Sequence, residues 1–304
     1  MVTWGYLGWQ LRGYVQLMRP KFAIASLLIY LAALLTVDKS PDWSSYALWA
    51  GVASVMLVQL SGQLANEYSD WKGDIFSRRT FFAGGSGIIP TGRASPGSAL
   101  ALGIVTAALA LWSAYYVTIA VDGRGLFLPI IAIGLVLSWS YSIRPVRLAN
   151  TGIGEPVVAV LTAFILPTMA IYYATSLMQV QWELSLPLFF FSMAMLISVE
   201  YPDRHADIRA GKRNILYRLG IRRAAGLQAL CSFIGFALVV YFILTGSLGW
   251  LVGLVFITLP FVWAAATVMG MSKYYEHEQA AIASAAVSFA LVVLILLLLV
   301  DAAL

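Results

Sequence analysis

The chain has 304 residues, of which 61% are hydrophobic and only 11% are charged. Soluble globular domains carry about 25% charged residues, so this composition excludes an ordinary soluble domain and indicates a protein built for a lipid bilayer. The net charge of +5 indicates no nucleic-acid partner, because the basic residues lie in short segments between apolar runs.

Apolar runs of membrane-spanning length follow one another along the chain. The first 21 residues mix aromatic and basic side chains, as segments at a membrane interface do, and show no pattern of a removable signal peptide. Each later run is close to the roughly 20 residues that a helix needs to cross the hydrocarbon core. The runs cover residues 20–37, 46–66, 97–119, 125–142, 154–174, 185–201, 224–245, 247–270 and 280–300. We therefore expect an all-α integral membrane protein, with nine transmembrane helices around a central cavity in a single domain over residues 1–304.

The lysines and arginines indicate the orientation of these helices. If the N-terminus is cytoplasmic, all 19 of them except Lys39 and Arg124 fall on the cytoplasmic side. Basic residues concentrate in this way in the cytoplasmic loops of membrane proteins. We therefore expect a cytoplasmic N-terminus and an outside C-terminus, in the cell (plasma) membrane.

Two acidic stretches end apolar runs on the cytoplasmic side. Asn66, Asp70 and Asp74 are spaced four residues apart, so they share one face of a helix, and Asp203 and Asp207 have the same spacing. Stacked carboxylates repel one another unless a cation lies between them. Hard oxygen ligands suit Mg²⁺, which takes one or two carboxylates together with phosphate oxygens. The two stretches therefore predict a metal–diphosphate site that opens toward the cytoplasm.

The positions of the two stretches also indicate a weak internal repeat. The first closes the second expected span and the other closes the sixth, so four helices separate them. Two similar four-helix halves followed by a ninth helix would give this separation. Parallel repeats place their binding sites at the interface between halves.

The segments that follow the acidic stretches supply further candidates. Three glycines between residues 84 and 87 let the backbone approach a ligand closely. Arg79 or Arg93 in the same loop can neutralise phosphate charge, as can Lys212 after the second stretch. We expect residues 75–96 and 204–223 to close over the site as a lid that excludes water.

These residues together resemble a known family. The pattern Asn66-xxx-Asp70-xxx-Asp74, the pattern Asp203-xxx-Asp207 with the following Ala210-Gly211-Lys212, and the nine expected spans resemble the UbiA superfamily of membrane prenyltransferases. The resemblance covers essentially the whole chain. Tyr141-Ser142-xx-Pro145-xx-Leu148, followed by Gly152-xx-Glu155, is most similar to the 1,4-dihydroxy-2-naphthoate branch, which makes demethylmenaquinone.

The resemblance implies Mg²⁺-dependent transfer of a polyprenyl group from a polyprenyl diphosphate to an aromatic acceptor, in menaquinone biosynthesis. It implies that Tyr141 orients or deprotonates an acceptor hydroxyl and that Arg144 or Arg19 pairs with the acceptor carboxylate. The implied catalytic residues are Asp70, Asp203 and Tyr141, the implied metal ligands are Asn66, Asp70, Asp74, Asp203 and Asp207, and the implied substrate-binding residues are Arg19, Asn66, Arg79, Arg93, Arg144 and Lys212.

Two alternatives stay open at the level of the sequence. The same catalytic core can act on another acceptor, such as 4-hydroxybenzoate, homogentisate, chlorophyllide, haem or a glycerol phosphate. The other alternative is an ion-coupled transporter whose acidic pairs bind ions. Transporters place such charges near the bilayer midplane on broken helices, whereas these acids lie at one membrane face beside basic loops, which favours the enzyme.

Overall fold

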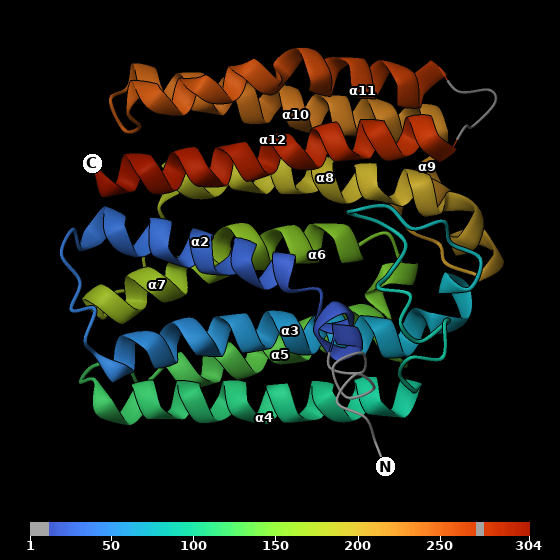
Figure 1. Ribbon diagram of the computed structural model, residues 1–304. Coiled ribbons are helices and arrows are strands. Elements are labelled where there is room, and N and C mark those ends of the chain that lie inside the picture. Colours follow the sequence, from blue (N-terminus) through green and yellow to red (C-terminus); the bar gives the residue numbers. More distant parts are fainter. Residues whose placement is uncertain (1–11, 272–276) are drawn as a thin grey trace.

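The computed structural model describes residues 12–271 and 277–304, and within them all regular secondary structure is helical, with no strand (Figure 1). The interfacial segment expected over residues 1–11 and the cytoplasmic position expected for Lys273 lie outside the described residues. The helices are α2 (Pro20–Val37), α3 (Tyr46–Asp74), α4 (Pro96–Ala120), α5 (Phe127–Ser142), α6 (Gly154–Val160), α7 (Leu166–Thr175), α8 (Trp182–Arg209), α9 (Ile215–Leu219), α10 (Ile221–Leu244), α11 (Leu259–Met271) and α12 (His277–Ala303). Residues 12–18 are also helical. Two 3₁₀ segments, η1 (Leu148–Asn150) and η3 (Trp250–Thr258), and one π-helical turn, η2 (Leu161–Ile165), lie between the helices.

Local side-chain chemistry explains where the helices begin. The Ser45 side chain accepts a hydrogen bond from Leu48 N and so caps the start of α3. Ser95 and Ser98 form a reciprocal capping box at the start of α4, where Pro96 occupies the first helical position. These caps satisfy backbone donors that would otherwise be unpaired at the helix starts.

The all-helical fold is confirmed, and its apolar helices fit a multi-pass membrane protein. Within the described residues, eight segments are long and apolar enough to cross a bilayer: Pro20–Val37, Tyr46–Asp74, Pro96–Ala120, Gly154–Thr175, Trp182–Arg209, Ile221–Leu244, Trp250–Gly270 and His277–Ala303. The fourth expected span forms α5, which is apolar but has only 16 residues. The expected count of nine spans therefore stays a prediction.

The helices alternate in direction, so their connections divide between two ends of the bundle (Figure 1). The end at the right of Figure 1 carries the last turns of α3 and α8 and the connections over residues 75–95, 143–153 and 210–220. The opposite end carries Lys39 and Arg124, which donate hydrogen bonds to the backbone oxygens of Ala302 and Tyr173. Both acidic stretches thus lie at one end, together with the basic loops.

Interhelical hydrogen bonds fix the rotation of α3, which carries the first acidic stretch. Trp139 Nε1 of α5 donates to Ser61 Oγ at 2.8 Å, and Ser61 Oγ donates to the Gly103 carbonyl oxygen of α4 at 2.8 Å. A Cβ on Gly103 would lie 3.4 Å from Leu64 Cβ, so the glycine allows this close approach. Small residues and polar side chains hold apolar helices together in this way where the hydrophobic effect between them is absent.

Candidate functional site

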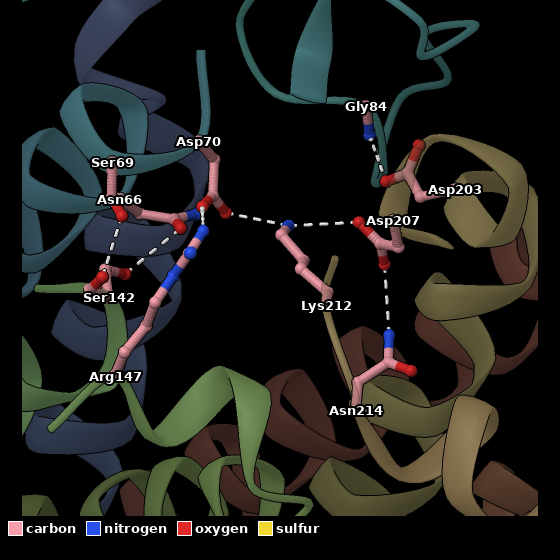
Figure 2. Close-up of polar contacts among 10 residues, drawn as sticks. All are labelled: Asn66, Ser69, Asp70, Gly84, Ser142, Arg147, Asp203, Asp207, Lys212 and Asn214. Carbon is pink, nitrogen blue, oxygen red and sulfur yellow. Dashed lines mark hydrogen bonds and ion pairs between the residues drawn. The ribbon is translucent and has the colours of Figure 1, made fainter. Parts of the chain in front are cut away.

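The acidic ends of α3 and α8 face each other at one end of the bundle, and Lys212 lies between them (Figure 2). Lys212 Nζ is 2.7 Å from Asp70 Oδ2 and 3.0 Å from Asp207 Oδ1. Because one ammonium group contacts both carboxylates, two stretches that are distant in sequence converge on one small volume.

The electrostatics of this bridge favour the charged form of Lys212. Burial alone would lower the pKa of the amine, but the carboxylates of Asp70 and Asp207 outweigh that effect and hold the pKa of Lys212 well above its usual range. Lys212 therefore carries a fixed positive charge between the two acidic stretches.

The connection between α5 and α6 brings a second cation to the same carboxylate. Arg147 has a φ of 42° at the start of η1, and its Nη2 donates to Asp70 Oδ1 at 3.2 Å. Nearby, Asn66 Oδ1 accepts a hydrogen bond from Ser142 Oγ at 3.1 Å, and Ser69 Oγ donates to the Ser142 carbonyl oxygen at 2.7 Å (Figure 2). These contacts tie the acidic end of α3 to the end of α5.

The loop between α3 and α4 lies against both acidic stretches. Gly84 N donates to Asp203 Oδ2 at 2.7 Å on α8. Ser86 N donates to Glu67 Oε1 at 2.7 Å and Ser86 Oγ to Glu67 Oε2 at 2.5 Å on α3. The loop thus spans the gap between the two helices, as a lid over the site would.

Gly85 shows why this loop needs glycine. Its φ is 63°, a conformation that side chains disfavour, and a Cβ at this position would collide with the carboxylate of Asp74. The backbone of the loop therefore lies directly on the last aspartate of the first stretch.

The expected arginines occupy different places. Arg19 donates from Nη2 to the Phe82 carbonyl oxygen at 3.0 Å. Burial lowers the pKa of Arg19, and the nearby carboxylates of Glu67, Asp74 and Asp203 oppose that effect. Arg19 therefore lies near carboxylates of both α3 and α8.

The other three expected arginines lie farther out. Arg79 is exposed and folds back so that its Nη2 donates to the Gly87 carbonyl oxygen at 2.9 Å. Arg93 Nη1 donates to Gln16 Oε1 at 3.0 Å. Arg144 is exposed just beyond α5. These hydrogen bonds of Arg79 and Arg93 thus end on Gly87 and Gln16 rather than on the aspartates of the acidic stretches.

Tyr141 lies in the last turn of α5, with its ring against the start of α6. A Cβ on Gly154 would be 2.8 Å from Tyr141 Cε2, so the absence of a side chain at Gly154 gives the ring its place. Tyr141 therefore stands next to the connection that also supplies Arg147.

Sequence reasoning missed several residues of this site. The position of Arg147 in the sequence indicates only a cytoplasmic basic residue, because nothing in its local pattern shows that the chain turns it back onto Asp70. Glu67 lies off the face shared by Asn66 and Asp70, yet it is buried and binds the loop. Asn214, whose Nδ2 donates to Asp207 Oδ2 at 3.0 Å, carries the one usable signal, since Asn followed by apolar residues predicts a helix cap.

The donor set fits a hard divalent ion that binds together with phosphate. Within residues 12–271 and 277–304, no group of three or more Asp, Glu, His or Cys side chains forms a ready-made metal centre. Each stretch instead offers paired aspartates, and Asp203 Oδ1 is buried without a well-formed hydrogen bond, although the Ser77 hydroxyl lies near this carboxylate. Mg²⁺ takes one or two carboxylates and completes its octahedron with water and phosphate oxygens.

Comparison with known proteins decides the family. Residues 25–285 match the UbiA prenyltransferase family. The chain belongs to this family. As a UbiA-family member it is a membrane-embedded prenyltransferase, which confirms the superfamily that the acidic stretches predicted and disfavours the transporter. Among curated proteins, no sequence matches the chain.

Solved structures share the UbiA fold at low sequence identity. A structure of digeranylgeranylglyceryl phosphate synthase in membranes has a TM-score of 0.62 and 16% identity, covering 97% of this chain and 99% of that chain. A UbiA homologue from Archaeoglobus fulgidus bound to GPP and Mg²⁺ has a TM-score of 0.58 and 18% identity, covering 93% and 99%. The apo UbiA homologue from Aeropyrum pernix K1 has a TM-score of 0.63 and 15% identity, covering 90% and 97%. At these identities the likeness shows the fold.

Proposed function

We propose that this UbiA-family protein transfers a polyprenyl group from a polyprenyl diphosphate to an aromatic acceptor, with Mg²⁺, between the acidic ends of α3 and α8. The bridge that Lys212 makes between Asp70 and Asp207 carries the proposal. Carboxylates that share one ammonium group need positive charge between them. Lys212 supplies that charge here, and Mg²⁺ would supply it when it binds together with the diphosphate. The UbiA homologues from Archaeoglobus fulgidus were solved with GPP and Mg²⁺ and with DMAPP and Mg²⁺, which supports the same donor chemistry here.

The acidic residues divide into two sets of ligands. Asn66, Asp70 and Asp74 would hold one ion, and Asp203 and Asp207 the other. When bound, Mg²⁺ neutralises the diphosphate and stabilises the charge that develops as it departs. A hard divalent ion prefers oxygen ligands of this kind.

The cations of the chain then act on the diphosphate. Lys212 has to give up at least one carboxylate when an ion binds there, and its ammonium group then becomes available to the diphosphate oxygens. Arg147 contacts Asp70, and Arg19 lies near the carboxylates of Glu67, Asp74 and Asp203, so both add positive charge around the site. Arg79, Arg93 and Arg144 are proposed to contribute only if their loops move toward the bound substrate.

The remaining steps follow from the substrates. The allylic C–O bond breaks and its electron pair leaves with the diphosphate. The electron-rich acceptor ring then attacks the allylic carbon and regains aromaticity by losing a proton or, where the attacked carbon carries the carboxylate, by losing CO₂ while the C–C bonding pair returns to the ring. The allylic carbocation that forms when the C–O bond breaks must be kept from water. The contacts of Gly84 with Asp203 and of Ser86 with Glu67 hold the loop against the acidic stretches. We propose that Tyr141 orients or deprotonates an acceptor hydroxyl.

We propose 1,4-dihydroxy-2-naphthoate as the acceptor, and hence a role in menaquinone biosynthesis. The segment from Tyr141 to Glu155, which resembles that branch, contributes Arg147 to the site and packs Tyr141 onto Gly154. Arg19 already lies beside three carboxylates that would repel another, so Arg144 is the better partner for the acceptor carboxylate.

An acceptor screen tests this proposal. Purified protein in nanodiscs is given a polyprenyl diphosphate with Mg²⁺ or EDTA, and diphosphate release is measured with each candidate acceptor. We expect Mg²⁺-dependent release that is fastest with 1,4-dihydroxy-2-naphthoate. Release with 4-hydroxybenzoate or a glycerol phosphate but not with the naphthoate would overturn the acceptor, and no metal-dependent release with any acceptor would overturn the enzyme mechanism.

We also propose that nine helices cross the plasma membrane, as two four-helix halves and a ninth helix, with the N-terminus and the site facing the cytoplasm. The 16 residues of α5 span about 24 Å, which suffices where protein or a thinned bilayer surrounds its ends. In a Cys231→Ser background, which lacks cysteine, Lys39→Cys should react with an impermeant thiol reagent in intact cells. Arg222→Cys should react only after lysis. The reverse pattern would refute the orientation.

A further inference from the structure

Two buried glutamates lie behind the acidic site. Glu155, in the first turn of α6, is 1% exposed, and Glu200 of α8 is 9% exposed. The two carboxyl groups lie close to each other, and Glu155 Oε2 is buried without a hydrogen-bond partner among the described residues. Neither belongs to the proposed metal ligands, and burying two carboxyl groups together is costly unless they are satisfied by donors.

Both glutamates accept hydrogen bonds from the start of one short helix. Glu155 Oε1 accepts from Ile215 N at 3.4 Å, and Glu200 Oε2 accepts from Leu216 N at 2.9 Å. Ile215 and Leu216 begin α9 and are themselves buried. Backbone donors of consecutive residues are therefore held by side chains from two different helices, α6 and α8.

The residues just before α9 contact the aspartates of the acidic stretches. Asn214 caps α9, since its Oδ1 accepts from Tyr217 N at 3.0 Å, and its Nδ2 donates to Asp207 Oδ2 at 3.0 Å (Figure 2). Lys212 lies two residues earlier and bridges the aspartates. The segment over residues 212–216 thus contacts Glu155 and Glu200 through the backbone N–H groups at the start of α9. It contacts the acidic stretches through the side chains of Lys212 and Asn214.

We propose that Glu155 and Glu200 are positioning residues for prenyl transfer. By holding the start of α9, they fix the positions of Lys212 and Asn214 relative to the aspartates of the acidic stretches. The inference rests on the function proposed above. The glutamates act at a distance, because they contact α9 rather than the aspartates. Their effect on the reaction must therefore pass through the placement of Lys212.

The first test measures that placement without activity. Metal-free, solubilised protein is treated with an amine-acylating reagent, and peptide mass spectrometry gives the rate at Lys212 relative to exposed Lys72 in the same molecule. Glu200→Ala removes the acceptor for Leu216 N, and the relative rate at Lys212 should rise about tenfold, as expected for loss of one buried hydrogen bond. Glu200→Gln keeps an oxygen for Leu216 N and an amide for Glu155, so it should restore the wild-type rate.

The second test asks whether Glu200 acts through Lys212. Glu200→Ala should raise the Mg²⁺ concentration needed for half-maximal turnover severalfold in the wild type, and should have little further effect in a Lys212→Met background, because coupled residues are non-additive. If Glu200→Ala fails to insert, Glu155→Ala, which removes the longer of the two contacts, is examined in the same way.

The outcomes separate this inference from the proposed function. A lowered melting temperature with unchanged acylation of Lys212 in Glu200→Ala or Glu155→Ala would overturn the positioning role and leave the proposed function intact. Additive effects of Glu200→Ala and Lys212→Met would do the same. Metal-dependent diphosphate release that survives Asp70→Asn would instead overturn the proposed function.

Discussion

Replacing Lys212 by methionine removes the positive charge between Asp70 and Asp207 while keeping a side chain of similar length. The side chain of Lys212 is 16% exposed, and those of Asp70 and Asp207 are 8% and 13% exposed. Removing one partner of a buried ion pair costs about 3–5 kcal/mol, because the remaining charge is left uncompensated. Arg147 still contacts Asp70, so we expect the lower end of this range, and a melting temperature lowered by roughly 6–12 °C.

The assay compares melting of the solubilised wild type and variant in EDTA and in saturating Mg²⁺. Because a bound divalent ion can replace the missing charge between the aspartates, the deficit of Lys212→Met should shrink when Mg²⁺ is present. Lys72→Met is the matched control. Lys72 is exposed in the last turn of α3, where its ammonium group lies over the Trp71 ring, so this variant should melt like the wild type. An equal deficit with and without Mg²⁺, or no deficit in EDTA, would refute the reasoning.

Three further substitutions probe the loop, the second acidic stretch and the acceptor side. Asp203→Asn can still accept from Gly84 N but loses its charge, so Mg²⁺-dependent diphosphate release should fall by at least about 10²–10³-fold, and turnover near the wild-type rate would remove Asp203 from the catalytic residues. Gly85→Ala should lower the melting temperature more than Gly92→Ala, because both glycines have a positive φ but only a Cβ at Gly85 meets the Asp74 carboxylate. The Gly92→Ala variant should lose only about 1–2 kcal/mol of unfolding free energy. Equal losses in the two variants would contradict the close approach of the loop to Asp74. Tyr141→Phe keeps the ring on Gly154 and removes the hydroxyl, so kcat should fall by about 10²–10⁴-fold if the hydroxyl transfers a proton, with the donor KM within about twofold; an unchanged kcat would leave Tyr141 with packing alone.

The sequence predicts the helices well where apolar runs and breakers coincide. The run over 20–37 matches α2 (Pro20–Val37), since Pro20 fits the first turn and the apolar run ends at Val37. The run over 46–66 stops short of the end of α3, which continues to Asp74. Hydropathy marks lipid contact, whereas the helix itself continues through polar residues that find partners in the loop.

The irregular elements were not predictable from local patterns. The expected span over 154–174 contains the π-helical turn η2, and the five-residue α9 lies in a segment expected only as part of a lid. Short or irregular turns depend on tertiary partners more than on propensity. In α9 those partners are Glu155, which lies 60 residues before Ile215, and Glu200, which lies 16 residues before Leu216.

The convergence of the acidic stretches could be predicted, but the residues around them could not. The four-residue spacing places Asp70 and Asp207 on helix faces, and counting spans places both stretches at one end of the bundle. That Arg147 reaches Asp70, while Arg144 stays exposed, depends on the backbone turn at Arg147 with its φ of 42°. An arginine in such a loop carries no local signal of which way it points.

The central claim is that both acidic stretches bind one prenyl diphosphate through Mg²⁺, and binding of a non-hydrolysable prenyl diphosphate analogue tests it most directly. Calorimetry in nanodiscs would compare the wild type, Asp70→Asn, Asp207→Asn and the double variant, each with Mg²⁺ and with EDTA. We predict that the wild type binds only with Mg²⁺, that each single variant binds measurably but much more weakly, and that the double variant is no weaker than the weaker single one. Binding that persists in EDTA, or losses that add as they do for independent sites, would contradict the account.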